Sequence, residues 1–275
     1  MSTTGPRDAR PVGVRDLLEM KRRGDKIVAL TAYDYLFGRL VDESGCDIVL
    51  VGDSLGQVVL GYDSTIPVTL AEMIHHAKAV RRGVKHALLV VDMPFLSYQV
   101  SAEETLRNAG TVLKETGCEA VKLEGGDERA AAMAGALVQV GIPVMGHVGL
   151  TPQSVHALGG YRVQGREQAD AQRILAEARR LQDAGCFSVV LELMPAGLAA
   201  DITRSLQIPT IGIGAGPTCD GQVLVLYDML GLNDGFKPKF LRRFAALAED
   251  SRGGLRDFVT AVRDGSYPDA EHSFD

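Results

Sequence analysis

The sequence predicts an α/β protein folded as a (β/α)8 barrel of the TIM type, and three observations favour this class. The chain has 275 residues, about the length that one such barrel needs. Three segments, at 43–53, 115–125 and 183–193, share an acidic residue, Gly-Cys, and an apolar run with a carboxylate at or near its end. Eight apolar runs also alternate with amphipathic segments. An open doubly wound sheet of the flavodoxin or Rossmann kind is the structural alternative.

The three similar segments mark helix ends that are followed by buried strands. Gly45, Gly117 and Gly185 can each end a helix, because glycine takes the left-handed conformation without a Cβ clash. The runs that follow them are rich in Val, Ile and Leu without strict alternation, which is typical of parallel strands covered on both faces. The three glycines lie about 70 residues apart, roughly the length of two helix-strand units.

Taken in chain order, the remaining elements complete the barrel. Residues 14–25 are predicted to form a short helix that caps the barrel bottom. The predicted strands span 26–32, 47–53, 86–94, 119–125, 143–149, 188–194, 209–216 and 221–228. Amphipathic helices separate most of them. The helix at 101–116 begins with Ser101 and has Glu104 three residues later, a capping-box pattern.

One domain is predicted for the whole chain, 1–275, with a barrel core at about 26–235, because no linker or composition break divides it. The tail at 239–268 is predicted to extend the barrel with two helices split at Gly253-Gly254. Its apolar face can pack on its own barrel or on a neighbouring subunit, and the sequence does not decide between them.

Composition excludes several classes of function. The net charge of −6, from 35 acidic against 29 basic residues, argues against nucleic-acid binding, which needs clustered Lys and Arg. No apolar stretch approaches the ~20 residues of a membrane helix, and the first residues lack the apolar core of a secretory signal. The four cysteines lack metal-site spacing, so we expect buried thiols and a reducing, cytoplasmic location.

Polar residues that end otherwise apolar strands are the candidates for chemistry, since barrels of this type carry their active sites at the carboxyl ends of the strands. These candidates are Asp53, Asp92, Lys122, Glu124, His147 and Glu192. Side chains alternate along a strand, so Lys122 and Glu124 point to the same side. If Val121 faces the helices, this pair faces the barrel axis, where it must pair, bind an ion or face a wet cavity. A satisfied ion pair at the barrel rim is the alternative.

A magnesium site is predicted from three of these acids. Asp53, Asp92 and Glu124 follow consecutive strands, and like charges crowded together require a cation. An all-oxygen ligand set suits Mg²⁺ better than zinc. Taken separately, each acid could instead be a loop-start cap or a solvated side chain.

Two further residues are candidates for proton chemistry or substrate contact. Glu192, expected across the barrel from the three acids, is a candidate general base, or else a partner of Lys122 or an arginine. His147 can hydrogen-bond a substrate or brace a loop. The GxGxG within 211–217 lacks the context of a dinucleotide fingerprint, and we favour close backbone packing over phosphate binding there.

The residues above lie in runs that resemble the ketopantoate hydroxymethyltransferase family, also called 3-methyl-2-oxobutanoate hydroxymethyltransferases. The matching runs are LTAYDY (30–35), VGDSLG (51–56), PVTLAEM (67–73), VVDMPF (90–95), VKLEGG (121–126), GHVGLTPQS (146–154), GGYRVQGR (159–166), LELMP (191–195), IPTIGIGAG (208–216) and CDGQVLVLYDMLG (219–231). They cover roughly residues 10–250 in order, and as a set they are highly specific.

The resemblance implies the same barrel, a reaction and a set of residue roles. A hydroxymethyl group passes from 5,10-methylenetetrahydrofolate to 3-methyl-2-oxobutanoate, through a Mg²⁺-stabilised enolate, to give 2-dehydropantoate for pantothenate synthesis. By resemblance, the Mg²⁺-associated positions are Asp53, Asp92 and Glu124. The substrate-binding positions are Asp53, Ser54 (through its backbone amide), Asp92, Lys122 and His147. The catalytic base is Glu192. The resemblance also implies a homodecamer of two pentameric rings.

Two other functions remain open at this point. Another metal-dependent enzyme that makes or breaks C–C bonds of 2-keto acids, such as an isocitrate-lyase-like lyase or a pyruvate aldolase, could use the same barrel. The lyase predicts a cysteine loop such as KKCGH, which the sequence lacks. A non-catalytic barrel that senses a small acid is the second alternative, and it predicts binding without proton exchange.

Overall fold

The computed structural model describes residues 10–274, and their strands form one closed parallel barrel. The strands follow one another around the barrel in chain order, and the last pairs with the first, Gly221 lying opposite Ile27. The strands are β1 (Ile27–Thr31), β2 (Ile48–Val51), β3 (Leu88–Asp92), β4 (Ala120–Lys122), β5 (Val144–Gly149), β6 (Ser188–Glu192), β7 (Thr210–Ile213) and β8 (Gly221–Leu224). The predicted (β/α)8 class is confirmed, and the open-sheet alternative is excluded by the β1–β8 pairing.

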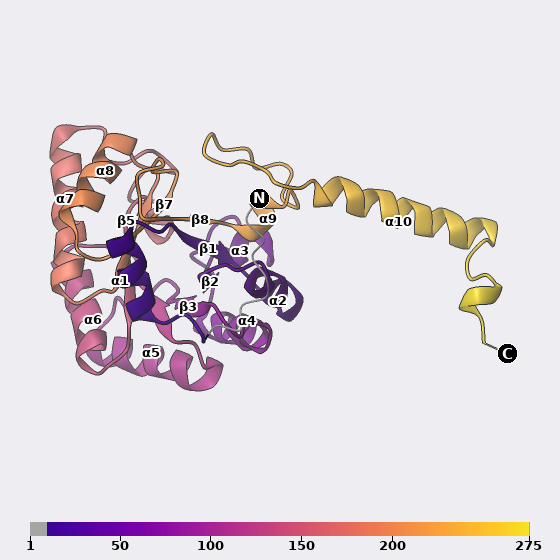
Figure 1. Ribbon diagram of the computed structural model, residues 1–275, viewed down its shortest axis with the longest axis horizontal. Helices are drawn as coiled ribbons and strands as arrows, with labels where there is room; N and C mark the ends of the chain where they lie inside the picture. Colours follow the sequence, from indigo (N-terminus) through magenta and orange to yellow (C-terminus); the bar gives the residue numbers. More distant parts are fainter. Residues whose placement is uncertain (1–9, 275) are drawn as a thin grey trace. The chain divides into compact units, whose positions relative to one another are not determined.

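Helices connect the strands and run outside them (Figure 1). In this part of the chain the helical segments are α1 (Val14–Arg23), α2 (Tyr35–Glu43), α3 (Leu55–Val58), α4 (Leu70–Gly83), α5 (Ala102–Thr116), α6 (Glu128–Gln139), η1 (Pro152–Ser154), α7 (Gln168–Asp183) and α8 (Ala196–Ser205). The side chain of Ser101 accepts a hydrogen bond from the N–H of Glu104, as its position predicts. Helix α5 ends at Gly117 with a φ of 70°, the left-handed stop expected there.

The barrel interior is filled by one cluster of apolar side chains that alternate along the strands. Ile27, Ile48, Leu88 and Ala120 belong to it, and Leu17 of α1 packs against them from below. Helix α1 therefore caps the barrel bottom, as predicted. Because Ala120 points inward, the two-residue period of a strand carries Lys122 to the same interior side, above the apolar layer.

The chain divides into two compact units after Val225. The first contains the barrel and ends short of residue 235, where the sequence placed the end of the barrel core. The second contains α9 (Leu226–Met229), α10 (Leu247–Asp264) and the short 3-10 turn η2 (Ala270–His272). No helix within residues 10–274 is long and apolar enough to cross a membrane.

The predicted split of the tail at Gly253-Gly254 is wrong, because α10 runs through both glycines as a single helix. A glycine costs a helix only about 1 kcal/mol relative to alanine, and the residues on either side favour helix. Neither glycine adopts a positive φ, whereas Gly265 does, at 76°, and the helix ends there. The stop signal lies at the glycine that takes the left-handed conformation.

Candidate active site

The polar residues predicted at the strand ends lie at the carboxyl end of the barrel, on five consecutive strands. Asp53 follows β2, Asp92 ends β3, Lys122 ends β4, Glu124 lies two residues further, His147 is in β5 and Glu192 ends β6. All are buried except Glu192, whose side chain is 19% exposed. The closed barrel therefore brings these residues together at one end, where they form a candidate site.

Asp92 is the centre of the first group of contacts. Lys122 Nζ lies 2.5 Å from Asp92 Oδ1, and the backbone N–H of Asp53 donates to Asp92 Oδ2 at 3.1 Å. Both oxygens of this buried carboxylate thus have a donor. The side chain of Ser54, the next residue, is held by Tyr33, whose Oη lies 2.8 Å from Ser54 Oγ.

The acids around Lys122 carry more negative charge than its single ammonium group can balance. Burial, together with the charges of Asp92 and Glu124, raises the pKa of Asp53 well above its ordinary value. Burial alone would lower the pKa of Lys122, but the three surrounding carboxylates outweigh it and raise that pKa. One ammonium among three carboxylates leaves the site short of positive charge, which a bound cation would supply.

His147 connects the acids to Glu192. Its Nδ1 lies 3.6 Å from Glu124 Oε1, and its Nε2 lies 3.2 Å from Glu192 Oε2. Burial would lower the pKa of His147, but the two carboxylates outweigh it and raise the pKa to about 9. Burial would raise the pKa of Glu124, but His147 and Lys122 lower it. The imidazole of His147 therefore lies between two carboxylates, and Glu192 is closer to the acid group than the sequence led us to expect.

The backbone around Glu192 is constrained on both sides. Leu193, the next residue, has a φ of 48°, and its N–H donates to the carbonyl of Ile213. On β5, Gly149 has a φ of 95°, and a Cβ there would lie 2.3 Å from the carbonyl oxygen of Glu192. A left-handed leucine is uncommon and costs energy, and such strain is concentrated at functional sites.

Gln153 is a site residue that the sequence reasoning missed. It lies in η1, in the loop after β5, and it is 5% exposed. Its backbone N–H donates to Glu124 Oε2 at 2.9 Å, and its Nε2 donates to Asp53 Oδ2 at 2.9 Å. The run TPQS contains it, but nothing in the periodicity of a loop indicates where a polar side chain points.

The donor set fits a hard divalent cation. Asp53, Asp92 and Glu124 offer only oxygen, and they lie in one buried site with excess negative charge. Within residues 10–274 no three His, Cys, Asp or Glu side chains already converge as a metal-binding cluster. Mg²⁺ commonly takes one or two protein carboxylates and completes its shell with water and substrate oxygens, so the residues present suit it.

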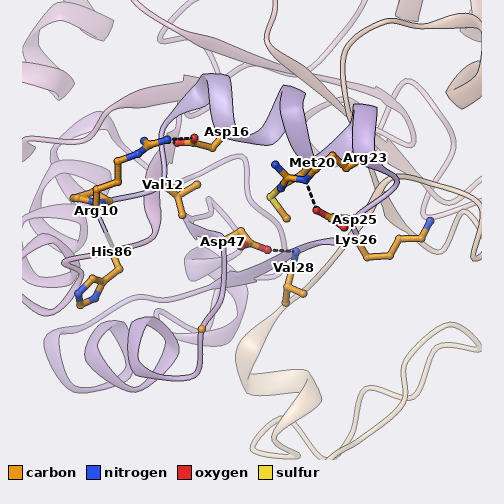
Figure 2. A pocket seen from close by; sticks show the side chains of 12 residues that line it. Arg10, Val12, Asp16, Met20, Arg23, Asp25, Lys26, Val28, Asp47 and His86 are labelled. Atoms are coloured by element: carbon orange, nitrogen blue, oxygen red, sulfur yellow. Dashed lines mark hydrogen bonds and ion pairs between the residues drawn. The ribbon is translucent and has the colours of Figure 1, made fainter. Parts of the chain in front are cut away.

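A hollow of about 590 Å³ lies at the opposite end of the barrel, between α1 and the starts of β1, β2 and β3 (Figure 2). Its charged groups are largely engaged with one another. Arg10 pairs with Asp16, Arg23 pairs with Asp25, and Asp47 accepts from the N–H of Val28 (Figure 2). We assign these contacts to the stability of the barrel bottom, since active sites of this fold lie at the other end.

The fold and the site together define a (β/α)8 barrel protein with a buried acidic site suited to a divalent cation. The ketopantoate hydroxymethyltransferase family profile matches residues 11–270. A 3-methyl-2-oxobutanoate hydroxymethyltransferase of Heliobacterium modesticaldum is 56% identical, over 97% of this chain and 96% of the relative. One of Syntrophus aciditrophicus is 55% identical, over 93% of each. The chain belongs to the ketopantoate hydroxymethyltransferase family.

Solved structures show the same fold at low sequence identity. A phosphonopyruvate hydrolase in complex with oxalate and Mg²⁺ superposes with a TM-score of 0.61 at 12% identity, covering 94% of this chain and 92% of the hydrolase. A phosphoenolpyruvate phosphomutase of Streptomyces platensis gives 0.62 at 14% identity, covering 92% and 88%. At such identities these matches establish the barrel alone.

Proposed function

We propose that this enzyme transfers a hydroxymethyl group to 3-methyl-2-oxobutanoate from 5,10-methylenetetrahydrofolate, which gives 2-dehydropantoate for pantothenate synthesis. The observation that carries the proposal is the 51–56% identity, over nearly the whole chain, to relatives named for this transfer. The buried site agrees with this proposal. It contains acids that can bind a cation, an ammonium group that can bind the substrate carboxylate, and a partly exposed carboxylate that can accept a proton.

Mg²⁺ is the cation that we propose for Asp53, Asp92 and Glu124. Their shared burial and the raised pKa of Asp53 support this assignment, since a cation would relieve the repulsion among them. When bound, Mg²⁺ supplies positive charge beside the keto oxygen, and this makes the adjacent C–H more acidic, a contribution on the order of several kcal/mol.

Substrate binding is assigned to residues around the same acids. Asp53 and Asp92 border the place of the 2-keto acid, and Lys122 and the backbone amide of Ser54 hold its carboxylate. The position of Lys122, buried and already beside Asp92, supports an electrostatic role toward an anion. His147 forms part of the pocket wall and keeps Glu192 in place through the 3.2 Å contact.

Glu192 is the base in this proposal. It takes the proton from carbon 3 of 3-methyl-2-oxobutanoate, and the electron pair left on that carbon forms a bond to the one-carbon unit of the folate, in its iminium form. Water breaks the bond between the transferred carbon and the folate nitrogen: its hydroxyl group goes to the carbon and its proton to the nitrogen, so that tetrahydrofolate leaves. The partial exposure of Glu192 supports this role, because a base must reach both the substrate and the solvent.

Proton exchange tests this function without the folate. In D2O with Mg²⁺, the wild-type enzyme should exchange the carbon-3 proton of 3-methyl-2-oxobutanoate, as followed by 1H NMR, and a chelator should stop the exchange. Glu192→Gln should slow it by about 10²-fold or more, whereas Glu103→Gln, on an exposed turn of α5, should not. Equal exchange by Glu192→Gln and wild type would remove Glu192 from the base role. No transfer to 3-methyl-2-oxobutanoate by the wild type would overturn the function.

The cellular setting of the enzyme is also part of the proposal. We propose a cytoplasmic homodecamer that acts on small molecules and binds neither nucleic acid nor membrane. The acidic balance of 35 to 29 charged residues supports the absence of a nucleic-acid surface.

A further inference from the structure

Gln153 has a fully defined set of hydrogen bonds inside the site. Its Nε2 donates to Asp53 Oδ2 at 2.9 Å and to the carbonyl of Met93 at 3.0 Å. Its Oε1 accepts from Tyr98 Oη at 2.9 Å and from Gln99 Nε2 at 3.1 Å. An amide has two N–H groups and two acceptor positions, and all four are used.

The chemistry of the partners fixes which way this amide points. A backbone carbonyl can only accept, so the nitrogen of Gln153 must face Met93, and the same nitrogen is the one that lies beside Asp53. The reverse orientation would place an oxygen against two oxygens in a buried site. The N–H group next to Asp53 is therefore a requirement of the packing.

One residue thus connects the loops that follow three strands. The side-chain amide of Gln153 holds Asp53, after β2, and the carbonyl of Met93, after β3. Its backbone N–H holds Glu124, after β4. Tyr98 completes the frame, since its hydroxyl accepts from the N–H of Glu124 at 3.1 Å and lies 2.9 Å from Gln153 Oε1.

The neutrality of the amide matters for a cation site. An arginine or lysine at position 153 could also donate to Asp53 but would offset the negative charge that attracts a cation. A neutral donor fixes the carboxylate and leaves its charge available. This combination of full burial, donor direction and neutrality distinguishes an orienting residue from a space-filling one.

We propose that Gln153 is the positioning residue that orients Asp53 and Glu124 for the divalent cation and the keto acid. The inference rests on the proposed function and extends it to a residue without contact to the reacting atoms. It predicts that the direction of the hydrogen bond from residue 153, and not the total charge of the site, limits cation binding.

Calorimetric titration with Mg²⁺, without substrate, tests this in three variants. Gln153→Met removes the side-chain donors at similar length, and Gln153→Glu keeps the shape but turns an acceptor toward Asp53. The Mg²⁺ Kd should rise about 10- to 100-fold in both, the usual effect of losing such a partner. Gln99→Met is the matched control, because it removes a neighbour of Gln153 Oε1 and leaves both acids held. Its Kd should change less than threefold.

The outcomes separate this inference from the function itself. A Gln153→Met Kd within twofold of wild type overturns the inference, and so does tighter binding by Gln153→Glu, which would show that total charge sets the affinity. If Gln153→Met does not fold by circular dichroism, the isosteric Gln153→Glu decides. Carbon-3 proton exchange at saturating Mg²⁺ should also fall in Gln153→Glu. Wild-type enzyme that binds no Mg²⁺ contradicts the proposed function, and the inference with it.

Discussion

Lys122 shows how much a single buried side chain determines in this barrel. Its ammonium group lies 2.5 Å from Asp92, and it interacts with the charges of three buried carboxylates. A buried charge that loses its partner keeps its desolvation cost and gains nothing in return. The free energy of folding should therefore depend on Lys122 more strongly than on a lysine at the surface.

Replacement of Lys122 by methionine should lower the stability of the metal-free enzyme by about 3 kcal/mol, because it leaves Asp92 buried and unpaired. Urea unfolding in the presence of a chelator measures this. Added Mg²⁺ should recover part of the loss, since a cation can take over the charge. Lys78→Met is the control, because Lys78 pairs with Glu115 where both side chains are more than 40% exposed. It should cost less than about 1 kcal/mol, and an equal loss in both variants would show that Lys122 does not stabilise the acids.

At the scale of the element, Asp42 of α2 holds the turn that leads into β3. Its carboxylate accepts from the N–H groups of Lys85, His86 and Ala87 at 2.8 to 3.0 Å. Burial would raise the pKa of Asp42, but these hydrogen bonds outweigh it and hold the pKa below its ordinary value of 3.8. Because the folded-state pKa is lowered, this stabilisation is present above the ordinary pKa and is lost as the pH falls through the lowered one.

Asp42→Asn should therefore destabilise the enzyme at neutral pH, by about 2 kcal/mol, since an amide cannot accept all of these bonds. The difference from wild type should shrink as the pH falls below about 4. Urea midpoints measured between pH 7 and pH 3 test the direction. Asp201→Asn, at an exposed pair with Arg204, serves as the control and should show neither effect. A difference that grows on acidification would contradict the assignment.

Most elements could be predicted because each has a local cause. The strands follow from buried apolar runs, and α5 from Ser101 at its start and Gly117 at its end. Except in β5, which ends at Gly149 as predicted, the strands end earlier than predicted, since hydrogen bonding in the sheet stops before the predicted segment does. In β4, for example, pairing ends at Lys122, and Gly125 instead forms an isolated antiparallel bridge with His147.

The candidate site was predictable where it depends on strand ends and not where it depends on loops. Asp92 and Lys122 close β3 and β4, so the barrel itself brings them together. Gln153 reaches Asp53 from 100 positions away in the sequence, through a loop without periodicity. The short distance between His147 and Glu192 could not be predicted for a related reason. It results from the pairing of β5 with β6, and no local sequence pattern indicates this pairing.

At the scale of the whole molecule, helix α10 of the second unit has an exposed apolar face that is relevant to subunit assembly. Leu255, Phe258, Val259 and Val262 are spaced three and four residues apart on α10, so they share one face of the helix. Their exposed fractions range from 43% to 65%. Four large apolar side chains on one face are unusual for a helix that is surrounded only by water.

We expect a neighbouring subunit to cover this face in the proposed homodecamer. Phe258→Asp, which places a charge in the centre of this face, should therefore lower the native mass. Light scattering after size-exclusion chromatography should give about ten times the chain mass for wild type and a smaller multiple for the variant. Thr260→Asp adds the same charge at an exposed polar position of α10 and should leave the mass unchanged. If Phe258→Asp keeps the wild-type mass but unfolds at lower urea, the helix packs within its own chain, because the charge would then disturb folding without disturbing association.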